Sequence, residues 1–327
     1  MNNTETWQQA LADLITDPGE LLSLLELDPA LYQEAMQAVQ SFPLKVPRGY
    51  VKRMQKGNLH DPLLQQVLPL GLELIQVPGY DLDPLHESET NPVPGLLHKY
   101  HGRVLITLTS ACAIHCRFCF RRHFPYDENN PGKRGWEKIF AYLAKDPSIS
   151  EVILSGGDPL AVSDHLLQSF TQQLTLIPHI KRLRIHTRLP IVLPERITPS
   201  LLDWLTHLTL EPVIVVHTNH PQEINEEVEA ALSLLKRASI HVLNQSVLLK
   251  GVNDEALILA LLSEKLFAAG VLPYYLHLLD KVQGAAHFDL LHERAQTLHR
   301  ELSAMLPGYL VPRLVCEEAG RPGKVLV

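Results

Sequence analysis

Six short runs rich in β-branched and aliphatic residues recur along the last two thirds of the chain, and stretches with helical periodicity separate them. The runs span residues 104–109, 151–156, 182–187, 213–218, 240–247 and 272–278. From the second run onward they start about 30 residues apart, the length of one strand–helix repeat. Apolar strands that alternate with helices form parallel sheets covered by those helices. The pattern predicts an α/β fold, and it fits both a partial (β/α)6 TIM-like barrel and a flat doubly wound sheet.

Two of the predicted helices have recognisable starts. Pro199 follows Thr198 and suits the first turn of a helix. Asn253 and Asp254 are both good N-terminal caps, and they precede a stretch at 256–269 with apolar residues at helical spacing.

Residues 1–103 show no such strand repeat. Their periodicity predicts helices near 6–16, 19–27 and 29–40, and proline-punctuated stretches follow. We therefore predict a helical N-terminal extension at 1–103, a barrel core at 104–307 and a short C-terminal segment at 308–327, which begins with an extended run at 308–315.

Charge and hydropathy exclude some classes of partner. The chain has 29 basic and 36 acidic residues, a formal net charge of −7, which disfavours binding to nucleic acid or anionic membranes through bulk charge. The first residues are polar and acidic and do not resemble a signal peptide. No apolar run approaches the roughly 18–20 residues that span a bilayer. We expect a cytoplasmic protein with neither a nucleic-acid nor a membrane partner.

Three of the four cysteines lie within eight residues, directly after the first predicted strand. Cys112, Cys116 and Cys119 follow the pattern Cys-x3-Cys-x2-Cys. Without an export signal, this crowding indicates a metal or redox site rather than disulfides. Three thiolates on one loop can hold three irons of a [4Fe–4S] cluster and leave the fourth iron open to a ligand. A zinc site of three cysteines with His115 or His123 is the alternative.

Three arginines flank these cysteines. Arg117, Arg121 and Arg122 are predicted to lower the pKa values of the thiols and to offset the negative charge of a cluster.

The cysteine spacing, placed after the first strand of a (β/α) repeat, resembles the radical S-adenosylmethionine superfamily. The resemblance implies a [4Fe–4S] cluster on the three cysteines, with S-adenosylmethionine bound to the open iron and cleaved to a 5′-deoxyadenosyl radical. Ser155, Gly156 and Gly157 end the second predicted strand, where glycines let the backbone approach a ligand closely. They resemble the superfamily element that holds the methionine amino group.

Longer stretches, covering nearly the whole chain from Phe42 onward, resemble the lysine 2,3-aminomutase family. The matching stretches are PVPGLLHKYHGRVL (92–105), CAIHCRFCFRRHF (112–124), SGGDPL (155–160), TRLPIVLPERIT (187–198), HTNHPQEI (217–224), NQSVLLKGVND (244–254), PYYLHLLDKVQGAAHF (273–288) and GYLVPRLV (308–315). Members of this family combine the cluster with pyridoxal phosphate and move an amino group from C2 to C3 of an amino acid.

The resemblance implies where pyridoxal phosphate binds. Lys324 occupies the place of the lysine that forms a Schiff base with this cofactor. Lys99 and Arg103 match the positions that bind the cofactor phosphate, and the family often has arginine where Lys99 stands.

The resemblance also implies how the substrate and S-adenosylmethionine bind. Arg121 matches the residue that pairs with the substrate carboxylate. His217 and Gln245 match positions near S-adenosylmethionine. Asp280 and Glu317 match positions at the far end of the substrate, where two acids suit the ε-ammonium of lysine and disfavour glutamate.

The implied activity is that of an L-lysine 2,3-aminomutase, an isomerase that makes (R)-β-lysine. The chain stops three residues after Lys324 and resembles the short members of the family, which serve β-lysylation of elongation factor P together with a ligase that resembles lysyl-tRNA synthetase. Two alternatives stay open: a radical aminomutase acting on another amino acid, and a zinc-bound, non-catalytic binding module. The sequence leaves the oligomeric state open.

Overall fold

The computed structural model describes residues 6–130 and 132–327. Its strands are β1 (Leu96–Tyr100), β2 (Arg103–Thr109), β3 (Glu151–Gly156), β4 (Arg182–Thr187), β5 (Glu211–Val216), β6 (His241–Val247), β7 (Leu272–His277), β8 (Arg313–Cys316) and β9 (Val325–Leu326). They form one sheet in which the spatial order follows the chain. Strands β2 to β8 run parallel, and β1 and β9 add an antiparallel strand at either side.

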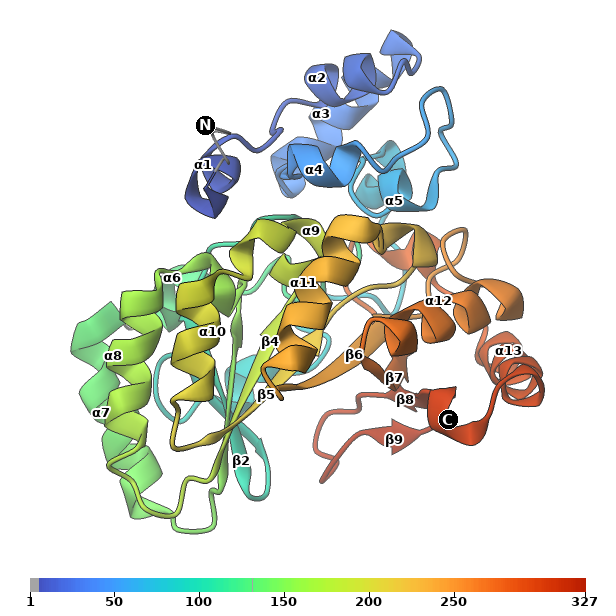
Figure 1. Ribbon diagram of the computed structural model, residues 1–327. Helices are drawn as coiled ribbons and strands as arrows, with labels where there is room; N and C mark the ends of the chain where they lie inside the picture. The colour runs from blue at the N-terminus through green and yellow to red at the C-terminus, as the bar shows by residue number, and fades with distance from the viewer. Residues whose placement is uncertain (1–5, 131) are drawn as a thin grey trace, which may run out of the picture.

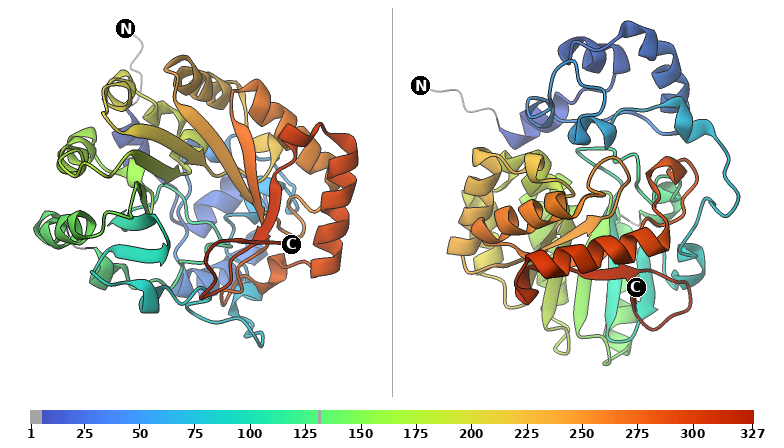
Figure 2. Two further views of the ribbon diagram at one scale, coloured as in Figure 1. Left: turned by 90° about the horizontal axis from the view of Figure 1, so that it is seen from below. Right: turned by 90° about the vertical axis from the view of Figure 1, so that its right-hand side faces the viewer.

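This strand order decides between the two folds that the sequence left open. A doubly wound sheet reverses its strand order at a switch point, whereas in a (β/α) barrel each strand lies beside the next one along the chain. The observed order has no reversal, and the sheet curves into an open arc with helices on its outer side (Figure 2). The prediction of a partial TIM-like barrel is confirmed.

The helices divide into an outer layer and an N-terminal group. They are α1 (Trp7–Ala12), α2 (Pro18–Leu24), α3 (Tyr32–Ser41), α4 (Arg48–Val51), α5 (Pro62–Gln65), α6 (Tyr126–Asn129), α7 (Gly132–Lys145), α8 (Asp164–Leu174), α9 (Leu189–Val192), α10 (Pro199–Thr206), α11 (Glu226–Arg237), α12 (Ala256–Ala268) and α13 (His292–Met305). Helices α7 to α13 flank the barrel, and α1 to α5 cover one of its ends (Figure 1). None of the described helices is both long and apolar enough to cross a membrane.

Alternation along each strand separates the core from the lumen. Val152 and Leu154 of β3, like Leu183 and Ile185 of β4, are fully buried in the main hydrophobic core of the protein. The residues between them point to the opposite face, because successive side chains of a strand alternate. The outward face therefore stabilises the fold, and the inward face is left to line a site.

The predicted helix starts had different outcomes. Pro199 lies in the first turn of α10, as predicted, and Thr198 caps this helix by accepting a hydrogen bond from the Leu201 backbone N–H. The predicted caps of α12 were wrong, because Glu255 holds the cap position and makes no side-chain cap bond. Asn253 and Asp254 instead accept from backbone N–H groups at 249 and 251, and so close the loop that precedes the helix.

Two parts of the chain differ from the strand predictions. Strand β1 lies within residues 1–103, where no strand was expected, and it pairs with β2, so the sheet begins before the predicted boundary. The extended segment predicted at 308–315 is confirmed only in its second half, because a 3-10 turn at Gly308–Leu310 precedes β8. The division into three domains stays a prediction.

Candidate active site

A cavity of about 850 Å³ occupies the lumen of the barrel. The cysteine loop that follows β2 lines one end, beneath the N-terminal helices, and the tail that follows β8 lines the other. All residues that the sequence predicted for the site line this one cavity, namely Cys112, Cys116, Cys119, Lys99, Arg103, Arg121, Ser155, Gly156, Gly157, His217, Gln245, Asp280, Glu317 and Lys324. The fold thus brings together residues that lie more than two hundred positions apart.

The three clustered cysteines are free thiols on the cavity wall. Burial, and then Cys116, raise the pKa of Cys119 to about 11, and burial raises that of Cys112 well above its usual range. Arg121 and Arg122 lower the pKa of Cys119, as predicted, but burial outweighs them, and at Cys112 the cation that lowers the pKa is Lys45. Buried carboxylates already neutralise those arginines, as the ion pairs of Glu73 and Glu87 show.

The geometry of the loop suits a cluster better than a single ion. Within the described residues, no three histidine, cysteine or acidic side chains are arranged to hold one metal ion. His115 Nδ1 lies 2.9 Å from the Pro43 carbonyl and His123 Nε2 lies 3.2 Å from the Gln283 carbonyl, so one nitrogen of each ring contacts a backbone carbonyl. The thiolates of a cubane bind three different irons and need not converge on one point.

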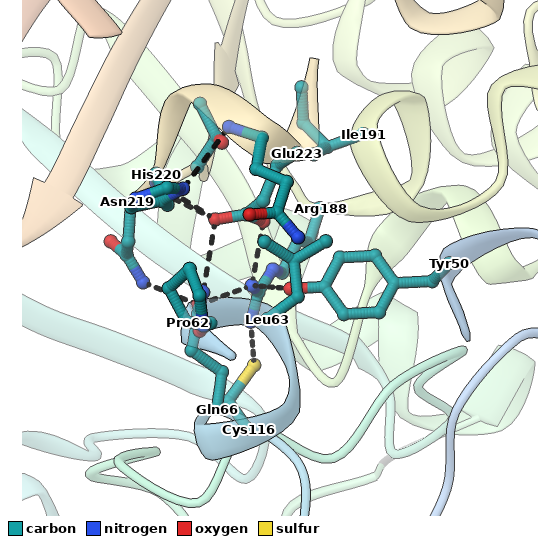
Figure 3. Close-up of polar contacts among 12 residues, drawn as sticks. Tyr50, Pro62, Leu63, Gln66, Cys116, Arg188, Ile191, Asn219, His220 and Glu223 are labelled. Carbon is teal, nitrogen blue, oxygen red and sulfur yellow. Dashed lines mark hydrogen bonds and ion pairs between the residues drawn. The ribbon is translucent and has the colours of Figure 1, made fainter. Parts of the chain in front are cut away.

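One arginine contacts a cysteine of the loop (Figure 3). Arg188 follows β4, and its Nη1 lies 2.6 Å from the Cys116 sulfur. Its Nη2 donates to Gln66 Oε1 at 2.7 Å, Glu223 Oε2 at 2.9 Å and the Tyr50 hydroxyl at 3.3 Å. A fixed cation beside a thiolate is the environment that a negatively charged cluster requires.

The two glycines after β3 allow the cysteine loop to pack against that strand. Gly156 has φ of +112°, and a side chain on it would place Cβ 2.7 Å from the Thr109 carbonyl oxygen. A Cβ on Gly157 would lie 2.7 Å from the Ser110 carbonyl oxygen. The Gly157 N–H donates to the Thr109 carbonyl at 2.8 Å. Both positions therefore require glycine before any ligand is considered.

Besides the Nε atoms of Arg122 and Arg188, four buried polar atoms on the cavity wall have no hydrogen-bond partner in the described structure. They are His186 Nε2, His217 Nε2, Gln245 Oε1 and His277 Nε2. Buried polar groups almost always have a partner, so these atoms fit a polar ligand in the cavity. Burial lowers the pKa of His217 to about 3 and those of the other two histidines well below the usual range, so the three rings are neutral near pH 7.

The sequence analysis did not identify His186 and His277 as residues of the site. The signal that could have found them is strand alternation: His186 lies two residues after Arg184 on β4, and His277 lies two residues after Tyr275 on β7. Arg184, His186, Tyr275 and His277 all line the cavity.

Opposite charges meet at the other end of the cavity. Lys324 Nζ lies 2.7 Å from Glu317 Oε2, and Lys99 Nζ lies 3.2 Å from Glu317 Oε1. Burial alone would raise the pKa of Glu317, but the two lysines outweigh it and hold this pKa well below its usual range. Glu317 was predicted to contact the substrate, and it forms ion pairs with the two lysines that were predicted to bind the cofactor.

Glu87 is a second acidic residue of the site, and no sequence motif marks it. Its carboxylate accepts from Arg121 Nε at 2.7 Å and from Nη2 at 2.8 Å, and it lies 3.1 Å from Lys99 Nζ. The Nη1 of Arg121 donates to Ser155 Oγ at 3.1 Å. Glu87 and Arg121 are both buried. The orientation of the predicted carboxylate-binding arginine is thus fixed before a substrate arrives.

Asp280 and Arg103 are the charged groups of this end that make no ion pair within the described residues. Burial, and then the negative charge of Glu317, raise the pKa of Asp280 to about 7. The Arg103 guanidinium lies 4.7 Å from the centre of the Tyr100 ring. An uncommitted guanidinium near the Lys324 amine fits a cofactor that carries both a phosphate and an aldehyde.

A (β/α) barrel whose first loop turns three cysteines toward a lumen with unpartnered polar atoms defines a radical S-adenosylmethionine protein. The family model described as Radical SAM superfamily matches residues 106–262. The L-lysine 2,3-aminomutase of Escherichia coli is 51% identical over 98% of this chain and 94% of its own length, and that of Haemophilus influenzae is 47% identical over 98% and 95%. The L-lysine 2,3-aminomutase of Clostridium subterminale is 36% identical over 98% of this chain and 77% of its own length. The chain belongs to the lysine 2,3-aminomutase family, whose superfamily binds a [4Fe–4S] cluster and S-adenosylmethionine.

Proposed function

We propose that the chain is an L-lysine 2,3-aminomutase that makes (R)-β-lysine with pyridoxal phosphate as a further cofactor. The observation that supports lysine as the substrate is Asp280, a carboxyl in the cavity that makes no ion pair within the described residues and whose pKa burial and Glu317 raise to about 7. An amino acid with a cationic side chain supplies a cation to pair with this carboxyl. A glutamate side chain would add a third negative charge beside Asp280 and Glu317.

Different residues of the cavity bind the two ends of the lysine substrate. Arg121 pairs with the substrate carboxylate, and Glu87 keeps its guanidinium plane in place. Asp280 and Glu317 receive the ε-ammonium group at the other end. When bound, the cluster and S-adenosylmethionine supply a hydrogen-abstracting radical, and pyridoxal phosphate carries the amino group as it moves.

Lys324 and the cations near it hold the second cofactor. The Lys324 amine lies in the cavity beside Glu317, where it can bond to an aldehyde carbon. Arg103 and Lys99 bind the phosphate, and Lys99 does so while Glu87 and Glu317 fix its position. The enclosing barrel wall limits the access of water to the reacting groups.

Anaerobic turnover tests this proposal. Protein reconstituted with iron, sulfide and pyridoxal phosphate is mixed with S-adenosylmethionine, a reductant and one amino acid at a time from a panel that includes lysine, glutamate and arginine. We expect β-lysine from lysine and no β-amino acid from glutamate. Loaded protein that leaves lysine unchanged, or that converts glutamate faster, contradicts the proposal.

We further propose that the product serves elongation factor P. A ligase that resembles lysyl-tRNA synthetase would attach (R)-β-lysine to a lysine of this factor in the cytoplasm. The support is similarity: the chain spans 94% and 95% of the Escherichia coli and Haemophilus influenzae relatives. Deleting the gene should remove the mass of one β-lysyl group from elongation factor P, and an unchanged mass would count against this role.

A further inference from the structure

Arg188 contacts a sulfur atom that the cluster requires. Its side chain is only 6% exposed, and its Nη1 lies 2.6 Å from the Cys116 sulfur. Among the described residues, no other cationic side chain donates a hydrogen bond to the sulfur of one of the three clustered cysteines. The flanking Arg117, Arg121 and Arg122 instead pair with carboxylates. The cationic side chain that contacts a cluster ligand therefore comes from a different loop, the one that follows β4.

Four groups from different parts of the chain hold this arginine, and Figure 3 shows three of them, Tyr50, Gln66 and Glu223. Tyr50 and Gln66 approach its Nη2 from the N-terminal helices, and Glu223 approaches from the turn after β5. The Arg188 backbone N–H donates to Asp158 Oδ2 at 2.7 Å. With both the backbone and Nη2 held, Nη1 remains directed at the sulfur.

Glu223 is itself fixed, so the anchor of Arg188 is rigid. Its carboxylate accepts from the backbone N–H groups of Asn219 at 2.8 Å and His220 at 3.1 Å. The side chain is completely buried, and Arg188 is the main cause that lowers its pKa against the effect of burial. Glu223 stays ionised and holds the arginine without competing for Nη1.

A guanidinium in this place acts on the redox equilibrium of the cluster. A reduced cluster carries one more negative charge than an oxidised one, and hydrogen bonds and positive charge at the ligating sulfurs stabilise that form. We propose that Arg188 is a positioning residue that raises the reduction potential of the [4Fe–4S] cluster through the Cys116 sulfur, and that the N-terminal helices set this effect through Tyr50 and Gln66.

The inference rests on the cluster of the superfamily and not on the lysine substrate. The test therefore uses reconstituted protein without S-adenosylmethionine, pyridoxal phosphate or lysine. The one-electron midpoint potential is measured by a mediated titration in which electron paramagnetic resonance reports the reduced cluster. The iron content of each sample is measured in parallel. Turnover of lysine by the wild-type protein tests the proposed function in a separate experiment.

Arg188→Gln removes the charge, and Arg188→Lys keeps it. For Arg188→Gln we expect the ratio of reduced to oxidised cluster at a fixed potential to fall at least about tenfold, which corresponds to a shift of about 59 mV toward more negative potential. Arg188→Lys should shift the potential less. Tyr50→Phe removes one anchor without contacting the sulfur, and it should shift the potential slightly in the same direction.

Arg196→Gln is the matched control. Arg196 is also completely buried and also pairs with a carboxylate, Asp164 at 2.6 Å, but it does not line the cavity. Its loss should lower stability and leave the potential unchanged. The proposal is overturned if Arg188→Gln keeps its iron and the wild-type potential, or if Arg196→Gln shifts the potential equally. If Arg188→Gln takes up no iron, wild-type potentials in both Arg188→Lys and Tyr50→Phe overturn it.

Discussion

The two ends of the cavity are both rich in charge, but their charges are held differently. At the cysteine end, Glu73 from the N-terminal part pairs with Arg117 and, at 2.7 Å, with Arg122, and all three side chains are at most 1% exposed. At the tail end, Glu317 pairs with Lys99 and Lys324, and all three line the cavity itself. In the first set only Arg122 lines the cavity and Glu73 and Arg117 do not, whereas the whole second set lies within the cavity.

This difference separates support from binding. Ion pairs buried behind the cysteine loop fix its geometry, and no ligand needs to break them. Ion pairs inside the cavity must exchange partners when a charged ligand enters, because the same lysines and carboxylates face that ligand. The cysteine end is therefore preorganised for one cluster, and the tail end is prepared to accept a cofactor and a substrate.

The largest effect should come from the tail end. Lys324→Ala removes the amine that holds pyridoxal phosphate, so we expect β-lysine formation to fall by at least about 100-fold. Iron content and slow cleavage of S-adenosylmethionine should persist, because the cysteine end is untouched. Product analysis of β-lysine and 5′-deoxyadenosine checks both statements. Lys56→Ala, at an exposed surface pair with Glu26, is the control and should retain full activity.

Substitutions at the cysteine end should change the stability of the protein rather than its catalytic activity. Glu73→Gln leaves the guanidinium groups of Arg117 and Arg122 buried without their counter-charge, which should cost about 3–5 kcal/mol of unfolding free energy. Urea unfolding of the apoprotein measures this cost. Glu26→Gln, which breaks the exposed pair with Lys56, should cost less than about 1 kcal/mol. Equal costs for the two variants would contradict the idea that the buried pairs support the loop.

Glu87 lies between the two ends and connects them, since it holds both Arg121 and Lys99. Glu87→Gln should lower kcat/KM for lysine about 10–100-fold, because a loss of orienting partners has effects of that size at sites with fixed ligands. The main change should be in KM, since Arg121 keeps its charge but loses its fixed plane. Steady-state kinetics with lysine measures this, and an unchanged KM would show that Arg121 needs no orienting carboxylate.

The sequence predicted the chemistry-bearing residues better than their partners. Strand periodicity and the family resemblance located the strands, the cysteines and Lys324, because each lies in a local pattern. Glu73 and Glu87 were not predicted, since their roles depend on contacts with residues about 30 to 50 positions away. The net rise in the pKa of Cys119 was also missed, because burial, which outweighs the lowering effect of Arg121 and Arg122, does not follow from a local pattern. The arginines were visible in the sequence, but the carboxylates that neutralise them were not.

The smallest effect concerns pH and tests the substrate end. Asp280 is mostly neutral below its pKa of about 7 and ionised above it, whereas the ε-ammonium of lysine stays charged throughout. The affinity for lysine should therefore rise with pH, and KM should increase by up to about tenfold for each pH unit below 7. Asp280→Asn should remove this dependence and keep KM high at pH 8.

The stability of the ligand-free protein should change with pH in the opposite direction. The pKa of Asp280 is higher in the folded state than in the unfolded state, so the folded state binds more protons between about pH 4 and 7. Stability from this group is then lost as pH rises through that range, by about 4 kcal/mol at most. Because Asp280→Asn cannot ionise, it should be more stable than wild type at pH 8 and bind lysine more weakly. A variant that loses both affinity and stability at pH 8 would show that Asp280 is a structural acid rather than the partner of a cationic substrate.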